Sequence, residues 1–183
     1  MKNKLTVLFA LFLFVCFAAC SCGSEVSALE NFCVAVRDFD LAKAEKYVLS
    51  GDKYFENVKS LSEELTDEQR KTVKDIYKNM AFSDFKEEGG VCTFTVKYVD
   101  FDRIIREVET SLNMGASADE SLREIAASET FQKRFMQTKT GVKVQLEKDG
   151  GNVYVSLGIS GENAEFTSLL GLDKFLRWYS LQS

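Results

Sequence analysis

The sequence predicts an α+β domain in which two β-hairpins form one antiparallel sheet and helices cover its apolar face. Apolar and polar residues alternate around two Gly-Gly turns, at residues 89–90 and 150–151, and an alternation of period two is typical of half-buried strands. Elsewhere, apolar residues recur every three or four positions, which indicates amphipathic helices. Because hairpins and helices come in separate blocks, an antiparallel sheet is favoured over a parallel one.

Three helices are expected before the first hairpin. An apolar stripe at spacings of three and four predicts the first helix over residues 26–36. Asp40 has the side chain of an N-cap and predicts a second helix over residues 41–49. The capping-box pattern of residues 66–69 predicts a third helix that ends near Asn79.

The first hairpin has its clearest strand at residues 91–99. A preceding strand at residues 80–85 pairs with it through a turn at Glu88-Gly89-Gly90. Alternate residues of the second strand share one apolar face, namely Cys92, Phe94, Val96 and Tyr98. We therefore expect this face to point into the core and the opposite face, which includes Lys97, to point to solvent.

The remaining elements follow the same two periods. Asp100 is expected to cap a helix over residues 101–112, and Ser117 to open a helix that reaches Phe135. The second hairpin spans residues 142–157. A closing helical pattern covers residues 166–181 and is interrupted around Gly171.

The first 19 residues have the pattern of a secretory signal peptide. Lys2 and Lys4 form a basic start, and residues 5–17 are almost wholly apolar. This apolar run is too short to cross a bilayer comfortably. We therefore expect a signal peptide at residues 1–19, a short tether at residues 20–25 and a single domain at residues 26–183.

The end of this leader carries a second signal. Phe17-Ala18-Ala19-Cys20 resembles the lipobox of bacterial lipoproteins. The resemblance implies that the mature chain begins at Cys20 and carries lipid on it. It also implies an extracytoplasmic protein, periplasmic or at the cell surface, that is held on a membrane by acyl chains.

A second resemblance concerns the domain. The segments Glu30-Asn31-Phe32, 40–44, 88–100 and 142–150 are similar in pattern to small cystatin-like and NTF2-like domains, which often follow a lipobox in uncharacterised bacterial lipoproteins. This resemblance implies a cone between sheet and helices that can hold an apolar ligand. The sequence departs from the pattern at 153–155, where Val-Tyr-Val stands after the last turn and such families often place tryptophan.

Composition limits the classes of function. The net charge is −5, and removal of the two lysines of the leader brings the mature chain near −7. A mild acidic excess argues against nucleic acid as a partner and against electrostatic docking on an anionic membrane. The chain has no histidine, so histidine-based metal sites and Ser-His-Asp catalysis are excluded. We expect no metal and no cofactor.

The five cysteines divide by position. Cys16 leaves with the leader and Cys20 is the expected site of lipid attachment. Cys33 and Cys92 both occupy core-facing positions, so they either form a disulfide or remain two buried free thiols that act as small apolar side chains. Cys22 is then left over.

Two functions from different classes are compatible with these residues. The first is a non-enzymatic lipoprotein of the cell envelope whose domain binds a protein partner or a small ligand. The alternative is an enzyme on an NTF2-like cone that uses an Asp/Tyr pair for proton transfer. Its candidate residues are Asp84, Tyr98, Asp100 and Tyr154. The simpler interpretation of Asp100 is a helix cap. The simpler interpretation of Tyr98 is a position in the core.

The only tryptophan lies in the sequence Arg177-Trp178-Tyr179. These residue types are enriched in binding hot spots. Packing of a closing amphipathic helix against the sheet explains them as well. A third hypothesis is an assembly protein that dimerises through the exposed face of its sheet.

Overall fold

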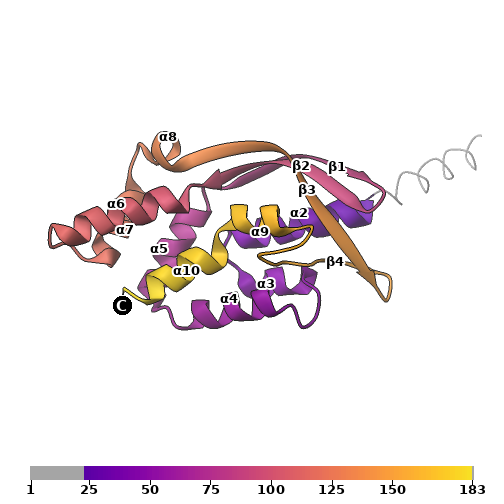
Figure 1. The fold of residues 1–183 in the computed structure, drawn as a ribbon, viewed down its shortest axis with the longest axis horizontal. Coiled ribbons are helices and arrows are strands. Elements are labelled where there is room, and N and C mark those ends of the chain that lie inside the picture. The colour runs from indigo at the N-terminus through magenta and orange to yellow at the C-terminus, as the bar shows by residue number, and fades with distance from the viewer. Residues whose placement is uncertain (1–22, 183) are drawn as a thin grey trace, which may run out of the picture.

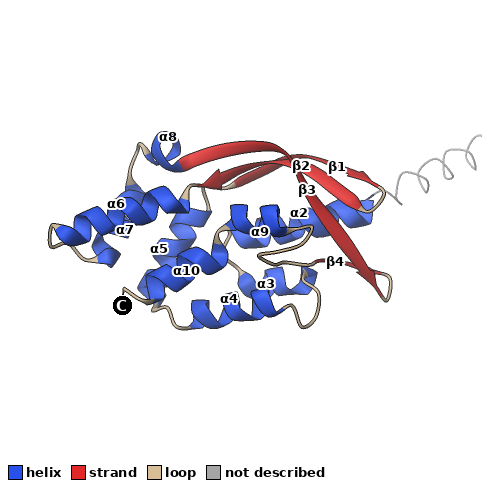
Figure 2. Ribbon diagram, in the orientation of Figure 1, coloured by secondary structure: helices blue, strands red, loops and turns tan. Residues whose placement is uncertain are grey.

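The computed structural model describes residues 23–182 and has the α+β fold that the sequence predicts (Figure 2). Within these residues, the chain forms a four-stranded antiparallel sheet with the strand order β1-β2-β3-β4. The strands are β1 (Ala81–Glu88), β2 (Val91–Val99), β3 (Met136–Asp149) and β4 (Asn152–Val155). The two predicted hairpins are therefore joined through β2 and β3.

Helices lie against one face of this sheet, whereas the opposite face is uncovered (Figure 1). Helices α2 and α9 lie directly beneath the strands, and α6 and α7 form one end of the molecule. The helices are α2 (Gly23–Arg37), α3 (Leu41–Ala44), the 3₁₀ turn η1 (Glu45–Tyr47), α4 (Lys53–Glu63), α5 (Asp67–Tyr77), α6 (Phe101–Asn113), α7 (Ala118–Ala127), α8 (Phe131–Phe135), α9 (Ala164–Leu170) and α10 (Leu172–Ser180).

The register of β2 and β3 places the apolar residues of both strands on the covered face. Cys92 pairs with Val144, and Phe94 pairs with Val142. All four side chains are buried. A bulge in β1 next to Asp84 and a second one in β3 next to Gly141 each add one residue to the strand and strengthen its twist.

Aromatic contacts connect the sheet to the helices. Phe94 of β2 meets Phe166 of α9 edge to face at 5.5 Å, and Phe166 meets Phe32 of α2 at 6.1 Å between ring centroids. A second aromatic cluster joins α5, α6 and α10 through Tyr77, Phe101 and Phe175. These contacts bury the apolar face of each helix in one core.

Local capping signals place the helix starts as predicted. Thr66 and Gln69 form a complete capping box at the start of α5. Asp40, Asp100 and Ser117 accept backbone N–H bonds as the N-caps of α3, α6 and α7. Each of these caps needs only residues three positions apart, so the spacing in the sequence determines it.

Two predicted helices were wrong in extent, and one helix was not predicted. The helix expected over 41–49 ends early, because Val48 leaves it to form a parallel bridge with Val155. The helix expected to reach Phe135 divides into α7 and α8. Helix α4 was missed, although Asp52 caps it and Phe55 and Val58 form its buried stripe.

The structure also bears on the expected tether. Helix α2 begins at Gly23, and Glu25 in its first turn forms an ion pair with Lys148 beside the turn of the second hairpin. The end of the segment predicted as a flexible tether is therefore helical. The signal peptide at residues 1–19 and the lipid site at Cys20 lie outside the described residues.

Candidate functional site

A cleft lies between the starts of α4 and α10, and we call it the α4–α10 cleft. Its volume is about 560 Å³, which is within the usual range for small-molecule sites. Residues 49–54 and Asn57 form one wall, and residues 156–160 after β4 form another. Asp173 and Arg177 of α10 complete the lining. Helices α4 and α10 pack side by side (Figure 1).

Asp52 joins two walls of the cleft. Its Oδ1 accepts the Phe55 N–H at 3.0 Å as the N-cap of α4, and its Oδ2 accepts the Leu157 N–H at 2.7 Å. A carboxylate is well placed at a helix start, because it satisfies a free N–H and opposes the positive end of the helix dipole. With both oxygens engaged, Asp52 holds the segment after β4 against the start of α4.

Asp173 is the centre of a second polar group in the cleft. Its Oδ1 accepts hydrogen bonds from Asn57 Nδ2 of α4 and, at 2.8 Å, from Arg177 Nη2 one turn further along α10. Its Oδ2 has no hydrogen-bond partner in the described part of the chain. The carboxylate, amide and guanidinium thus keep one another in fixed positions while retaining free donors and acceptors.

Tyr54 lies at the same point. Its hydroxyl oxygen accepts the Asp173 N–H at 3.2 Å, at the start of α10. The hydroxyl proton itself has no acceptor among residues 23–182. Burial, together with the charges of Asp173 and Asp52, raises the pKa of Tyr54 to about 12. Tyr54 therefore stays a neutral hydrogen-bond donor at neutral pH.

The wall formed by residues 156–160 supplies polar and apolar groups. Ser156 and Ser160 line the cleft with hydroxyls that bond no other described residue. Between them, Ile159 is 85% exposed. An exposed isoleucine gains nothing for folding, so it is available for contact with a ligand.

In the described part of the chain, no hydrogen bond joins the Asp and Tyr residues predicted for a proton-transfer pair, although Tyr98 and Asp100 are only two positions apart. Asp84 is exposed in the bulge of β1, where it accepts the Ser83 hydroxyl proton. Asp100 accepts the Arg103 N–H at 3.0 Å and caps α6, which confirms the prediction that it is a helix cap. Tyr98 and Tyr154 pair with Gln137 and Glu147 of β3, and ten residues along a strand correspond to roughly 33 Å.

Buried side chains fill the face of the sheet that the helices cover. This is the face where the resemblance to NTF2-like domains implies a cone. Phe94 and Val96 are 1% and 0% exposed. Phe85 stacks on Phe94 at 5.0 Å between ring centroids. The α4–α10 cleft lies at the starts of two helices and not under the sheet.

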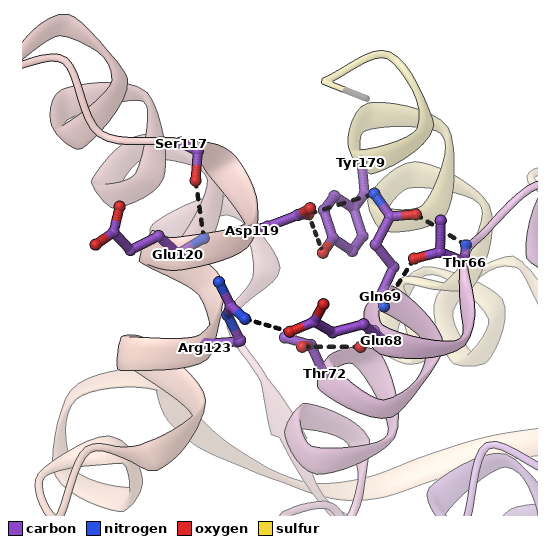
Figure 3. Close-up of polar contacts among 9 residues, drawn as sticks. All are labelled: Thr66, Glu68, Gln69, Thr72, Ser117, Asp119, Glu120, Arg123 and Tyr179. Atoms are coloured by element: carbon purple, nitrogen blue, oxygen red, sulfur yellow. Dashed lines mark hydrogen bonds and ion pairs between the residues drawn. The ribbon is translucent and has the colours of Figure 1, made fainter.

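The three residues Arg177-Trp178-Tyr179 face different surroundings. Arg177 lines the α4–α10 cleft, whereas Trp178 stacks on Phe175. Tyr179 is buried, and its hydroxyl donates to Asp119 Oδ1 of α7 at 2.6 Å (Figure 3). These three residues are neighbours in the sequence, but they do not form one site. The helix places Arg177 at the cleft and directs Trp178 and Tyr179 toward the core.

Figure 3 shows an Asp/Tyr pair that the sequence analysis missed. Besides Tyr179, Asp119 accepts a hydrogen bond from Gln69 Nε2 of α5 at 3.3 Å. Arg123 of α7 forms an ion pair with Glu68 of α5. The contacts connect three helices, which gives Asp119 a structural role in joining α7 to the core. The signal in the sequence was limited to the capping patterns that contain Gln69 and Asp119.

Cys33 and Cys92 are both buried free thiols in the structure. Burial raises the pKa of each thiol, to about 11 for Cys92. A thiol with a raised pKa is protonated and unreactive at neutral pH.

No family model, no curated protein and no solved structure matches this chain. The likeness to cystatin-like and NTF2-like domains and the lipobox stay predictions. In the described part of the chain, acidic and cysteine side chains form no cluster of three suited to a metal ion. None of the helices between residues 23 and 182 is long and apolar enough to span a membrane.

Proposed function

We propose that this chain is a lipid-anchored protein of the cell envelope whose domain binds a ligand or a partner in the α4–α10 cleft without transforming it chemically. The observation that carries the proposal is the set of unused groups in that cleft. The Tyr54 hydroxyl proton, Asp173 Oδ2 and the hydroxyls of Ser156 and Ser160 all lack partners within residues 23–182. Ile159 adds an exposed apolar contact.

The state of the charged groups supports binding rather than catalysis. Asp52 uses both carboxylate oxygens for backbone N–H groups, and Asp173 is paired with Arg177. A general base needs a free lone pair close to its substrate, and Asp52 has both oxygens engaged. Asp173 offers its Oδ2, which is free within residues 23–182, to a ligand as a hydrogen-bond acceptor. Charges held by their own neighbours orient a ligand more readily than they exchange protons with it.

The anchoring half of the proposal rests on the leader and on Cys20. Multiple acyl chains are needed for stable attachment, since each buried CH₂ contributes about 0.8 kcal/mol. Mass spectrometry of the protein from the membrane fraction is expected to find an acylated N-terminal Cys20 and no residues 1–19. An unmodified N-terminus at another residue, in a soluble fraction, would contradict this.

A photo-crosslinking experiment tests the binding half. Benzoylphenylalanine replaces Ile159 in the full chain in cells that produce the protein, and the control replaces Met114. Met114 is the matched position, because it is also an apolar side chain and is 77% exposed, but it lies after α6. We expect a discrete adduct at position 159 that is missing at position 114. Equal labelling or no adduct would refute binding at the cleft.

A further inference from the structure

We propose that the ligand of the α4–α10 cleft is a neutral, polyhydroxylated molecule, such as an uncharged oligosaccharide of the envelope. This inference rests on the proposed function and names the class of ligand for the same site. Three features of the cleft support it: its balanced charge, its mixture of donors and acceptors, and its apolar lip.

The charge of the lining is balanced. Its ionisable acids are Asp52 and Asp173, and its bases are Lys53 and Arg177. The positive end of α4 is already occupied by the Asp52 carboxylate. An anionic ligand would be repelled by this carboxylate, and a cationic ligand would be repelled by Arg177 and Lys53. A ligand without net charge therefore has the smallest electrostatic cost of binding.

The hydrogen-bonding groups alternate between donors and acceptors over a short distance. Tyr54 donates its hydroxyl proton, Asp173 Oδ2 accepts, and the guanidinium of Arg177 keeps further N–H groups beyond the one on Asp173. Ser156 and Ser160 can do both. A sugar hydroxyl is itself both donor and acceptor, and it can satisfy neighbouring groups of opposite kind at once.

The lip of the cleft is apolar on one side. Ile159 is 85% exposed, and Leu157 lies beside it with 8% exposure. The C–H face of a pyranose ring is apolar and can cover such a side chain. A peptide would gain its affinity from a free strand edge or a deep side-chain pocket. At the cleft, however, the end of β4 is already bridged, because Val155 pairs with Val48 and accepts the Leu49 N–H.

Binding is tested with the full chain on an array of immobilised neutral oligosaccharides, acidic oligosaccharides and unstructured peptides. We expect binding to a subset of the neutral sugars. Ile159→Asp should weaken it by about ten-fold or more, whereas the exposed control Met114→Asp should leave it unchanged. Because both side chains are exposed, neither variant should unfold the domain. Preference for acidic sugars or peptides, or equal loss in both variants, would overturn the inference.

The composition of the adduct at position 159 separates the two proposals. Analysis of the adduct should find neutral monosaccharides and no peptide from a protein other than this chain. An adduct made of protein would leave the proposed function standing and would overturn the carbohydrate ligand. The lack of any adduct, together with an array on which nothing binds, would overturn both.

Discussion

The hydroxyl of Tyr179 donates a hydrogen bond to Asp119 Oδ1 at 2.6 Å and so ties the last helix of the domain to α7, 60 residues earlier in the chain. The same carboxylate oxygen accepts from Gln69 of α5. One acidic side chain therefore joins three helices through hydrogen bonds.

Removal of this hydroxyl should destabilise the domain. Tyr179→Phe leaves the ring in place but deprives Asp119 of a partner, and loss of a hydrogen bond to a charged group costs about 1.5–3 kcal/mol. Urea denaturation measures the change. Tyr154→Phe is the control, since the Tyr154 hydroxyl has no bond in the described part of the chain, and its effect should be within about 0.5 kcal/mol. Equal losses would show that the Tyr179 bond contributes nothing.

Stability should fall as the pH rises above about 10, the ordinary pKa of tyrosine. Burial raises the pKa of Tyr54 to about 12 and also raises the pKa values of Tyr77 and Tyr179. Between pH 10 and 12 the unfolded chain has released these protons while the folded chain retains them, so the free energy of unfolding decreases with pH. Urea midpoints from pH 8 to 11 test this. A midpoint that stays constant, with all tyrosines ionised in the folded protein, would contradict it.

Gly171, between α9 and α10, should not tolerate a side chain. It has φ +62°, and a Cβ there would overlap the ring of Phe101. Gly171→Ala should cost about 2–5 kcal/mol from strain and overpacking together. Gly141→Ala is matched, because Gly141 has φ +69° and nothing within 4 Å of a Cβ. It should cost about 1 kcal/mol. Thermal unfolding compares them, and similar losses would mean that Phe101 moves aside.

The two faces of β2 should respond differently to aspartate. Val96 is 0% exposed, so Val96→Asp buries an unpaired charge and should unfold the domain. Lys97, the next residue of β2, is only partly buried and donates a hydrogen bond to Gln132. Its replacement by Asp should cost about 1 kcal/mol or less. Circular dichroism of both variants measures the outcome. Unfolding by Lys97→Asp would mean that the outer face is covered by a partner.

The two core thiols should be protected in the folded protein. A soluble chain that begins at Ser21 and carries Cys22→Ser has only Cys33 and Cys92. Both thiols are buried and have raised pKa values, so a disulfide reagent should react slowly with the native protein. After unfolding, the reagent should react with both thiols. No reaction with the unfolded, unreduced protein would show that the two cysteines are bridged.

The fold class and the starts of α3, α5, α6 and α7 could be predicted from the sequence, because short-range interactions determine them. Thr66 and Gln69 cap α5 across three residues. The alternation in β2 predicts the buried side chains as far as Val96, after which Tyr98 is only partly buried and Val99 is buried instead. Helix α4 was missed although Asp52 and Phe55 carry the same kind of local signal.

Only the tertiary structure decided where the candidate site lies. Asn57 meets Asp173 across 116 residues, and Asp52 meets Leu157 across 105. No periodicity in the sequence relates such positions, because their contacts depend on how α4 and α10 pack over a shared core. Tyr154 is separated from Tyr98 and Asp100 for the same reason. Local hydrogen bonds and burial set each helix and strand, whereas the packing of these elements determined which polar side chains came together.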